Sequence, residues 1–434
     1  MASRPPRLIA LLYLGTAHAA LLFACFMAAW WPRSVAGFFY HSWMVAIVHL
    51  VTLGWITFSI LGAIYIVAPL ALRMEMPSRR LDYVAYAFAV VGLVGMVGHF
   101  WIEEFGGMAF SAAMVTCAIL YMTFRIVRRV RDAQIHYGVK LHIVLACANI
   151  WLAASMGLLI AADKVWHFLP GFVLSNVFAH AHLAAIGWAT MMVVGVAYRL
   201  LPMTFPSRMI SGSSLNASAI LLETGVLGLF VTLLFRSAWS VLFGLFIAAG
   251  LIVFGLHIVW IRHAPAPKPP GAPDVNFAAL HAAAAGVSLI GATAIGLMLL
   301  VIPMTPFALH AAAAYGVLGL VGFLAQMVVA MEARWLPMRD RSLQAMVFAG
   351  WLVAVPALAG GLFLESAAFV SVGAWSLLAA VAIGTLDNAF VLLHVARQHP
   401  QGNQPEKNEV GKEERRHRRR AAEDALEQSR SGLA

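Results

Sequence analysis

Histidines are the residues of this chain whose type and position best suit chemistry. The 434 residues include 16 histidines, and His49, His180, His182 and His310 lie inside long apolar runs. An ionisable side chain is costly inside a lipid bilayer and is by default a functional candidate. A neutral imidazole nitrogen is a common ligand of metal ions and of haem iron. These four histidines therefore predict a metal or haem site between helices.

The composition around them is that of an integral membrane protein. Hydrophobic residues make up 62% of the chain and charged residues 11%, whereas soluble domains average about 45–50% and about 25%. This excess of apolar residues excludes a cytosolic enzyme, a secreted module and a nucleic-acid-binding domain, despite a net charge of +10. The three cysteines lie in apolar segments without a CxxC motif, which indicates packing residues.

Twelve apolar runs are long enough to cross a bilayer, which takes about 20 residues of helix. We predict spanning helices near 7–31, 42–70, 82–102, 108–127, 140–162, 174–200, 214–235, 239–261, 276–302, 308–332, 343–364 and 367–395. The remaining segment, 400–434, is charged, and we expect a tail that is disordered or partly helical. The fold class is therefore an all-α integral membrane protein with a lipid bilayer as its surroundings.

The distribution of positive charge predicts how these helices are oriented. Only three of the 29 lysines and arginines, Arg33, Lys164 and Arg236, fall on connections opposite the N-terminal side. Cytoplasmic loops carry the excess of lysine and arginine in membrane proteins. We therefore expect both termini in the cytoplasm of a bacterial-type inner membrane.

A sequence pattern that starts at His49 recurs at His182, 133 residues later. The matched pairs are His49 and His182, Leu50 and Leu183, Gly54 and Gly187, Trp55 and Trp188, Thr57 and Thr190, Gly62 and Gly195, Tyr65 and Tyr198, and Pro69 and Pro202. A weaker third copy consists of Gly322, Phe323 and Pro337, with Val317 in the histidine position.

This repetition predicts three parallel four-helix units around a pseudo-threefold axis. The expected units are about 1–133, 134–266 and 267–399. An even number of helices in each unit gives every copy the same orientation in the membrane. Because many secondary transporters carry inverted repeats, the pattern counts against a transporter.

The predicted orientation sorts the histidines by depth. His49, His180, His182 and His310 all fall in the outer portions of the second, sixth and tenth helices, and His99 joins them near the outer end of the third. For one such histidine alone, a hydrogen bond to a neighbouring helix is the simpler interpretation. For His49, His182 and His310 together, ligation is the better one.

The spacing of His180 and His182, and the acids that follow His99, limit what the histidines can bind. His180 and His182 are two residues apart, so an α-helix directs their rings to opposite sides and they cannot chelate one ion together. Glu103 and Glu104 follow His99 at the outer end of the third helix, where Glu103 falls on the same face as His99. We therefore include His99 and Glu103 as secondary candidates, as partners of a ligand or as interfacial residues.

With three four-helix units and this histidine layer, the chain resembles subunit I of the haem–copper oxidase superfamily, the large subunit of cytochrome oxidases and nitric oxide reductases. The resemblance implies that His49 is an axial ligand of a low-spin b-type haem and that His310 is an axial haem ligand. It places His182 at the position of the family's first copper ligand. It also implies one or two haems b, a cytochrome or quinol electron donor, and oxygen or nitric oxide as the gas.

Departures from the family pattern narrow this expectation. The family's oxidases carry two consecutive histidines on the seventh helix, whereas residues 215–235 contain none. The tenth helix has one histidine rather than two, and Ile186 stands where the family has a tyrosine. We therefore do not expect a complete three-histidine copper site. A diverged relative, similar to the NnrS-type membrane proteins, fits better.

Other polar residues support alternative functions. Glu223 and Asp387 are acids in the cytoplasmic half of predicted helices, where they form either a proton route or buried, protonated carboxyl groups. A proton- or solute-coupled transporter that uses them is one alternative, and a non-catalytic respiratory accessory subunit is another. Tyr65 and Tyr198 fall near the cytoplasmic surface, where we expect them in the aromatic belt.

Overall fold

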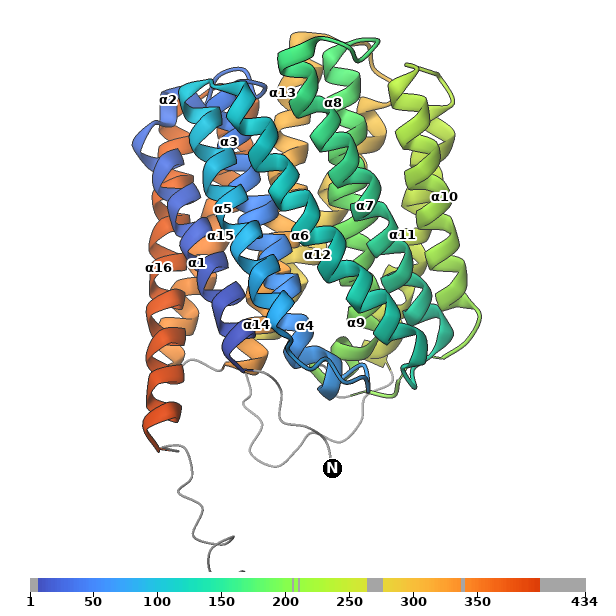
Figure 1. The fold of residues 1–434 in the computed structure, drawn as a ribbon, viewed down its shortest axis with the longest axis vertical. Helices are drawn as coiled ribbons and strands as arrows, with labels where there is room; N and C mark the ends of the chain where they lie inside the picture. Colours follow the sequence, from blue (N-terminus) through green and yellow to red (C-terminus); the bar gives the residue numbers. More distant parts are fainter. Residues whose placement is uncertain (1–6, 205–206, 210, 264–275, 337–339, 399–434) are drawn as a thin grey trace, which may run out of the picture. The chain divides into compact units, whose positions relative to one another are not determined.

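The computed structural model describes residues 7–204, 207–209, 211–263, 276–336 and 340–398. In this part of the chain, twelve helices are long and apolar enough to cross a membrane. The prediction of an all-α protein with twelve spans is therefore confirmed, and the observed ends lie close to the predicted ones. Figure 1 shows these helices in sequence colours.

Nine of the spans are single α-helices: α1 (Arg7–Trp30), α5 (Arg80–Ile102), α6 (Phe105–Asp132), α7 (Tyr137–Trp166), α10 (Ser214–Leu234), α11 (Ser240–His263), α12 (Phe277–Leu299), α15 (Arg341–Phe363) and α16 (Ala367–Gln398). Each of the other three combines two α-helices with a π-helix between them. They are α3 (Ser42–His49), η1 (Leu50–Thr57) and α4 (Phe58–Leu70); α8 (Val173–His182), η2 (Leu183–Thr190) and α9 (Met191–Thr204); and α13 (Pro306–Gly316), η3 (Val317–Ala325) and α14 (Gln326–Trp335). A short helix, α2 (Pro32–Val35), follows α1.

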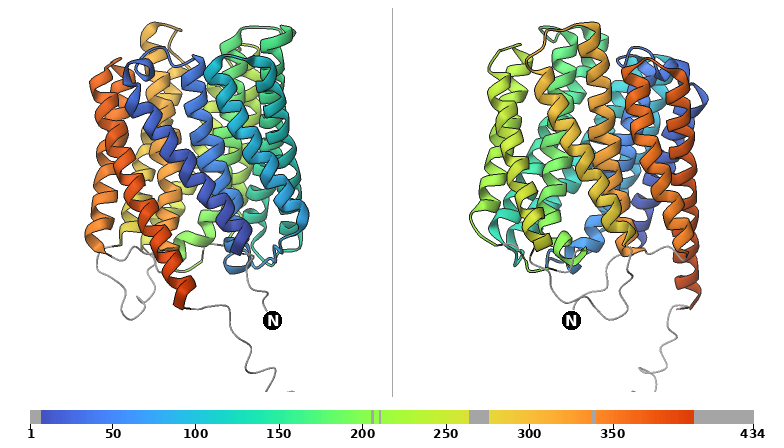
Figure 2. Two further views of the ribbon diagram at one scale, coloured as in Figure 1. Left: turned by 60° about the vertical axis from the view of Figure 1, so that its left-hand side comes forward. Right: turned by 180° about the vertical axis from the view of Figure 1, so that it is seen from behind.

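The chain divides into two compact units, Met1–Thr385 and Leu386–Ala434. The first unit contains every span except the last part of α16, and Figure 2 shows its long helices lying side by side. The predicted tail, 400–434, lies outside the described residues.

The π-helices mark the centre of the first unit. They occupy the second, sixth and tenth spans, and all three pack against one another. A π-helix adds a residue to the turn and is frequently found at functional sites. Two of the three begin directly after a candidate histidine, His49 and His182.

Two buried tryptophans connect these central helices. Trp55 of η1 donates its indole N–H to the carbonyl of Ala325, the last residue of η3. Trp188 of η2 donates to the hydroxyl of Thr57, the last residue of η1. Both tryptophans are 1% exposed, so each bond satisfies an indole N–H that has no access to water.

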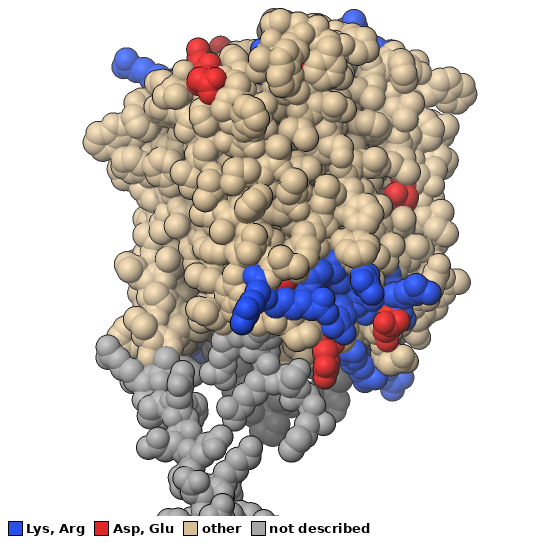
Figure 3. All heavy atoms as spheres, in the orientation of Figure 1, with Lys and Arg blue, Asp and Glu red and all other residues tan. Residues whose placement is uncertain are grey.

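On the face that Figure 3 shows, lysine and arginine side chains gather at one end of this unit, which we call the basic end. It comprises the connection between α4 and α5 and the end of α6, with Arg73, Arg79, Arg80, Arg128 and Arg131. The opposite end, where α5 ends and α6 begins, is called the distal end. Positive charge on the described helices is therefore segregated as the sequence predicts.

Close helix contacts require glycine at particular positions. A Cβ atom on Gly92 of α5 would lie 2.7 Å from the carbonyl oxygen of Ser111 and 2.9 Å from the amide nitrogen of Val115, both in α6. Backbone atoms cannot move aside as a flexible side chain can, so the two helices approach each other only because residue 92 has no side chain.

Gly92→Ala is therefore expected to destabilise the protein by about 1–3 kcal/mol, because α5 and α6 must separate. Gly98 provides a matched control on the same helix, since a Cβ there meets nothing within 4 Å. Thermal unfolding in detergent should show a lower midpoint for Gly92→Ala and an unchanged or higher one for Gly98→Ala. Equal midpoints for the two variants would contradict this packing.

Candidate functional site

His49 is the last residue of α3, directly before η1. Its Nδ1–H donates to the carbonyl of Val45 at 2.8 Å. Its ring stacks on Phe100, with 5.5 Å between ring centroids and 26° between planes. The hydrogen bond fixes the tautomer, so Nε2 carries a lone pair. This is the arrangement in which a histidine binds a metal through one nitrogen and is oriented through the other.

His180 of α8 has the same arrangement. Its Nδ1–H donates to the carbonyl of Ala153 in α7 at 2.9 Å. Gly157, one turn along α7, makes room for the ring, because a Cβ there would lie 2.8 Å from Cε1 of His180. The ring is close enough to His49 for the two to interact electrostatically. Within the described residues, the hydrogen bonds of both rings are made through Nδ1 and none through Nε2.

His182 differs because both of its ring nitrogens are engaged. Nδ1–H donates to the carbonyl of Phe178 at 2.7 Å, and Nε2 accepts from the hydroxyl of Tyr315 at 3.2 Å. The two rings are also stacked, with centroids 5.9 Å apart. The sequence analysis did not select Tyr315, which lies two residues before Val317, the residue in the histidine position of the third copy.

His310 of α13 contacts an acid rather than another histidine. Its Nε2 lies 2.8 Å from a carboxylate oxygen of Glu365, which belongs to the connection between α15 and α16. The side chains are 33% and 54% exposed. In this structure His310 is therefore held by an ion pair near the distal end.

His99 also pairs with an acid, but not with the predicted one. Helix α5 ends at Ile102, and Glu103 caps it in the left-handed conformation at φ 57°, so the helical spacing that would align Glu103 with His99 does not extend that far. Glu104 is the partner, at 3.6 Å from Nε2, and Ser111 lies 3.4 Å from Nδ1. The expected Glu103 contact is thus replaced by Glu104.

Of the two acids, Glu223 has a defined partner in the first unit. Its carboxylate accepts a hydrogen bond from Nδ2 of Asn149 at 2.6 Å, which joins α10 to α7. Asp387 lies on α16 in the second compact unit. Among the described residues, no group of three or more His, Cys, Asp or Glu side chains is arranged to hold a metal ion.

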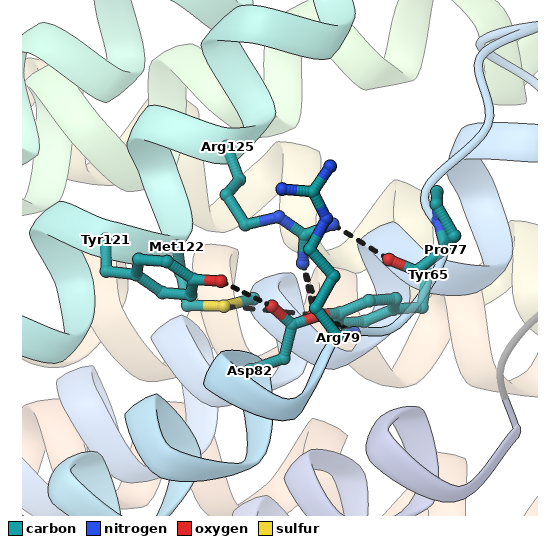
Figure 4. Close-up of polar contacts among 7 residues, drawn as sticks. All are labelled: Tyr65, Pro77, Arg79, Asp82, Tyr121, Met122 and Arg125. Atoms are coloured by element: carbon teal, nitrogen blue, oxygen red, sulfur yellow. Dashed lines mark hydrogen bonds and ion pairs between the residues drawn. The ribbon is translucent and has the colours of Figure 1, made fainter.

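An acid that the sequence analysis did not select, Asp82, is the centre of a polar cluster at the basic end (Figure 4). It forms an ion pair with Arg125 and accepts hydrogen bonds from Tyr65 at 2.8 Å and Tyr121 at 2.9 Å. Arg125 also donates to the carbonyl of Pro77 at 2.8 Å. Asp82 is fully buried, and these bonds make the cluster a structural connection between α4, α5 and α6.

The prediction that Tyr65 and Tyr198 lie in the aromatic belt is wrong. Tyr65 is fully buried, and Tyr198 is 2% exposed. Tyr65 faces Asp82, and the hydroxyl of Tyr198 lies 3.2 Å from Nδ1 of His257. The sequence indicated the position of each tyrosine along its helix, but it did not show that both side chains are directed toward other helices rather than toward lipid.

A pocket of about 570 Å³ lies at the distal end, beside the stacked rings of Trp43 and Trp101. His41 borders it and caps α3: its Nδ1 accepts from the amide of Met44 at 3.3 Å, and its Nε2–H donates to the carbonyl of Ser34 at 3.0 Å. Burial lowers the pKa of the His41 imidazole, while the bond to Ser34 and the charge of Glu103 oppose that change.

These contacts predict a pH-dependent helix start. Because the pKa is lower in the folded state, neutral His41 contributes its full stability above the unfolded value of 6.5 and loses it as the pH falls below that value. A protonated ring cannot accept from Met44. Amide exchange at Met44, corrected for its intrinsic pH dependence, should therefore accelerate on acidification. His41→Asn, a cap that does not titrate, should remove the effect, and its persistence in that variant would exclude His41 as the cause.

Comparison with known proteins finds no family model that matches the chain and no similar sequence among curated proteins. The functional argument therefore rests on the residues themselves, above all on His49 and His180, whose Nδ1–H groups are both held by backbone carbonyls.

Proposed function

We propose that this chain is a haem-binding protein of the haem–copper oxidase subunit I type, which transfers electrons to, or binds, a small gas such as nitric oxide or oxygen. The observation that carries the proposal is the pair of His49 and His180. Two histidines from different spans share one arrangement: in each, a backbone carbonyl accepts Nδ1–H, and Nε2 keeps its lone pair.

These residues fit a non-covalently bound haem b. Haem iron takes a neutral imidazole nitrogen as an axial ligand, and a hydrogen bond on the other nitrogen orients the ring and increases its basicity. His49 would hold the haem iron through Nε2, and His180 is the candidate for a second ligand. A bound haem would supply reversible one-electron chemistry and a position for a gas ligand.

The remaining histidines take supporting roles in this proposal. His182 is held by Tyr315 and would act beside the haem rather than as a copper ligand. His310 remains a candidate ligand of a second haem only if it leaves Glu365. The proposal therefore requires one haem b, allows a second, and does not require copper.

Recurrent structural features support the proposed arrangement of three parallel four-helix repeats around a pseudo-threefold axis. Each repeat would contribute one π-helix to the centre, and Trp55 and Trp188 each bond the end of the π-helix in another repeat. Each repeat would also contain a glycine whose Cβ would meet a backbone nitrogen of the next helix. These glycines are Gly92 against Val115, Gly225 against Ile247, and Gly361 against Val370.

We further propose that the protein resides in a bacterial-type inner membrane with both termini in the cytoplasm. The basic end would then face the cytoplasm, in agreement with the excess of lysine and arginine on that side of membrane proteins. The layer of His49, His180 and His182 would lie in the outer half of the bilayer. An electron donor, a cytochrome or a quinol, would approach from the outer side.

The test is the haem content of the purified protein. A pyridine haemochrome assay on protein expressed with an adequate haem supply should give a b-type spectrum and at least one haem per chain. Haem-free protein that retains its fold would reject the proposal. It would favour the alternative of a transporter, whose activity should then fall when Glu223 or Asp387 is neutralised.

A further inference from the structure

A series of polar side chains leads inward from the basic end between α9, α10 and α11. Ser214, exposed at the start of α10, lies 2.9 Å from Nε2 of His257 in α11. Nδ1 of His257 lies 3.2 Å from the hydroxyl of Tyr198 in α9. Solvent at the basic end is thus connected by hydrogen bonds to a buried hydroxyl.

His142 of α7 lies next to this series. Its ring packs edge-on against Tyr198, with centroids 5.4 Å apart, and it is close enough to His257 to interact electrostatically. Gly195 leaves room for it, since a Cβ there would lie 2.6 Å from Cβ of His142. Nδ1–H donates to the carbonyl of Gly138 at 2.7 Å. Nε2 is buried and has no protein partner among the described residues.

Asn149 lies two turns farther along the same face of α7, about 10 Å deeper by helix rise. It donates to Glu223 through Nδ2, while its Oδ1 is buried and has no protein partner among the described residues. Its Cβ and Cγ would each lie 2.8 Å from a Cβ on Gly187, in the π-helix that follows His182. Asn149 and Glu223 therefore lie beside η2.

The two orphan atoms, Nε2 of His142 and Oδ1 of Asn149, call for an explanation. A buried polar atom without a partner costs about 1–3 kcal/mol, and native proteins satisfy such atoms with ordered water. Both atoms belong to one face of one helix, and both face the span that contains η2 and α9. Water molecules between them would satisfy both atoms and would join the two polar groups.

We propose that these side chains form a proton path from the basic end to Glu223. A proton arrives at Nε2 of His257 by way of Ser214, and the proton on Nδ1 leaves to the oxygen of Tyr198. Tyr198 passes its own proton, through water, to Nε2 of His142. The titratable groups along the path come from four helices: His142, Tyr198, Glu223 and His257.

The remaining transfers also balance. His142 accepts and returns the proton at the same atom, because its Nδ1–H stays bonded to Gly138. Water carries the proton on to Glu223, whose carboxylate becomes a carboxylic acid at Oε1, the oxygen that Asn149 does not occupy. Ser214, His257, Tyr198 and His142 each gain one proton and lose one, Glu223 gains one, and nothing is oxidised or reduced.

The path rests on the proposed function only for its purpose: it would deliver protons toward the histidine layer, where reduction of a gas consumes them. Loading of Glu223 from the basic end requires no haem. Its test is therefore carried out on the protein whether or not haem is bound. A haem-free protein would reject the haem proposal and leave the path open to the same measurement.

The experiment is infrared spectroscopy of the full-length protein in nanodiscs during exchange from H₂O to D₂O. The carboxylic acid band that Glu223→Gln removes reports the proton on Glu223. In the wild type this band should shift within the time of buffer exchange. Tyr198→Phe and His257→Gln, which keep the size of the side chains, should each slow the shift by about tenfold or more.

Tyr65→Phe is the matched control, because Tyr65 occupies the corresponding position 133 residues earlier and contacts Asp82 instead of His257. It should leave the Glu223 exchange rate unchanged. Unchanged exchange in both path variants, or equal slowing by Tyr65→Phe, would overturn the proposal. So would the absence of a Glu223 band at every pH at which the protein remains folded.

Discussion

His49→Ala and His180→Ala are each expected to lower the haem content of the purified protein by more than about tenfold. Loss of a residue that only orients a ligand costs 10–100-fold in metal affinity, and loss of the ligand itself should cost at least as much. In the part of the chain that the structure describes, the Nε2 atom of each ring is the one without a protein partner. The measurement is haem per chain after expression and purification under identical conditions.

Two further variants make this prediction specific. His263→Ala is the control, since that side chain is exposed at the end of α11, and its haem content should equal that of the wild type. His182→Ala should lose less haem than His49→Ala, because Nε2 of His182 already accepts from Tyr315. A larger loss for His182→Ala, or for His310→Ala, would move the ligand assignment back to the residues that the family resemblance implies.

The second large effect is expected at the Asp82 cluster. Arg125→Met removes the cation that pairs with a fully buried carboxylate. Leaving one charge of a buried pair without its partner costs about 3–5 kcal/mol. The hydrogen bonds from Tyr65 and Tyr121 remain and stabilise the carboxylate only in part. We expect a clearly lower midpoint of thermal unfolding and a lower yield of folded protein.

A double variant separates the charge from the packing. Arg125→Met with Asp82→Asn removes both charges, so it should be more stable than Arg125→Met alone. An exposed arginine on the same helix, Arg128, supplies the control Arg128→Met, which should unfold like the wild type. If Arg125→Met also unfolds like the wild type, the cluster does not hold α4, α5 and α6 together.

The sequence predicts the twelve spans well because hydrophobic length is a strong signal in a membrane protein. The depth of His49, His180 and His182 in the membrane stays a prediction. The sequence does not predict the contacts of the individual histidines, such as the hydrogen bond between His182 and Tyr315. Helix faces were inferred from a regular α-helical spacing, and the π-helices at Leu50–Thr57 and Leu183–Thr190 alter that spacing.

The sequence also did not predict the individual side-chain contacts. Glu103 was expected beside His99, but the helix ends one residue before it, and Glu104 takes the contact. Asp82 is the first residue of a predicted helix, where an acid is usually solvated. The sequence therefore did not identify it as a candidate. Only the packing of α4 and α6 against it makes it a buried partner of Arg125.

The redox difference spectrum of the purified wild-type protein tests the central claim most directly. If His49 and His180 hold a haem b, the reduced-minus-oxidised spectrum must show the α-band of a low-spin b-type haem. Folded protein, expressed with an adequate haem supply, that shows no such band would contradict the account.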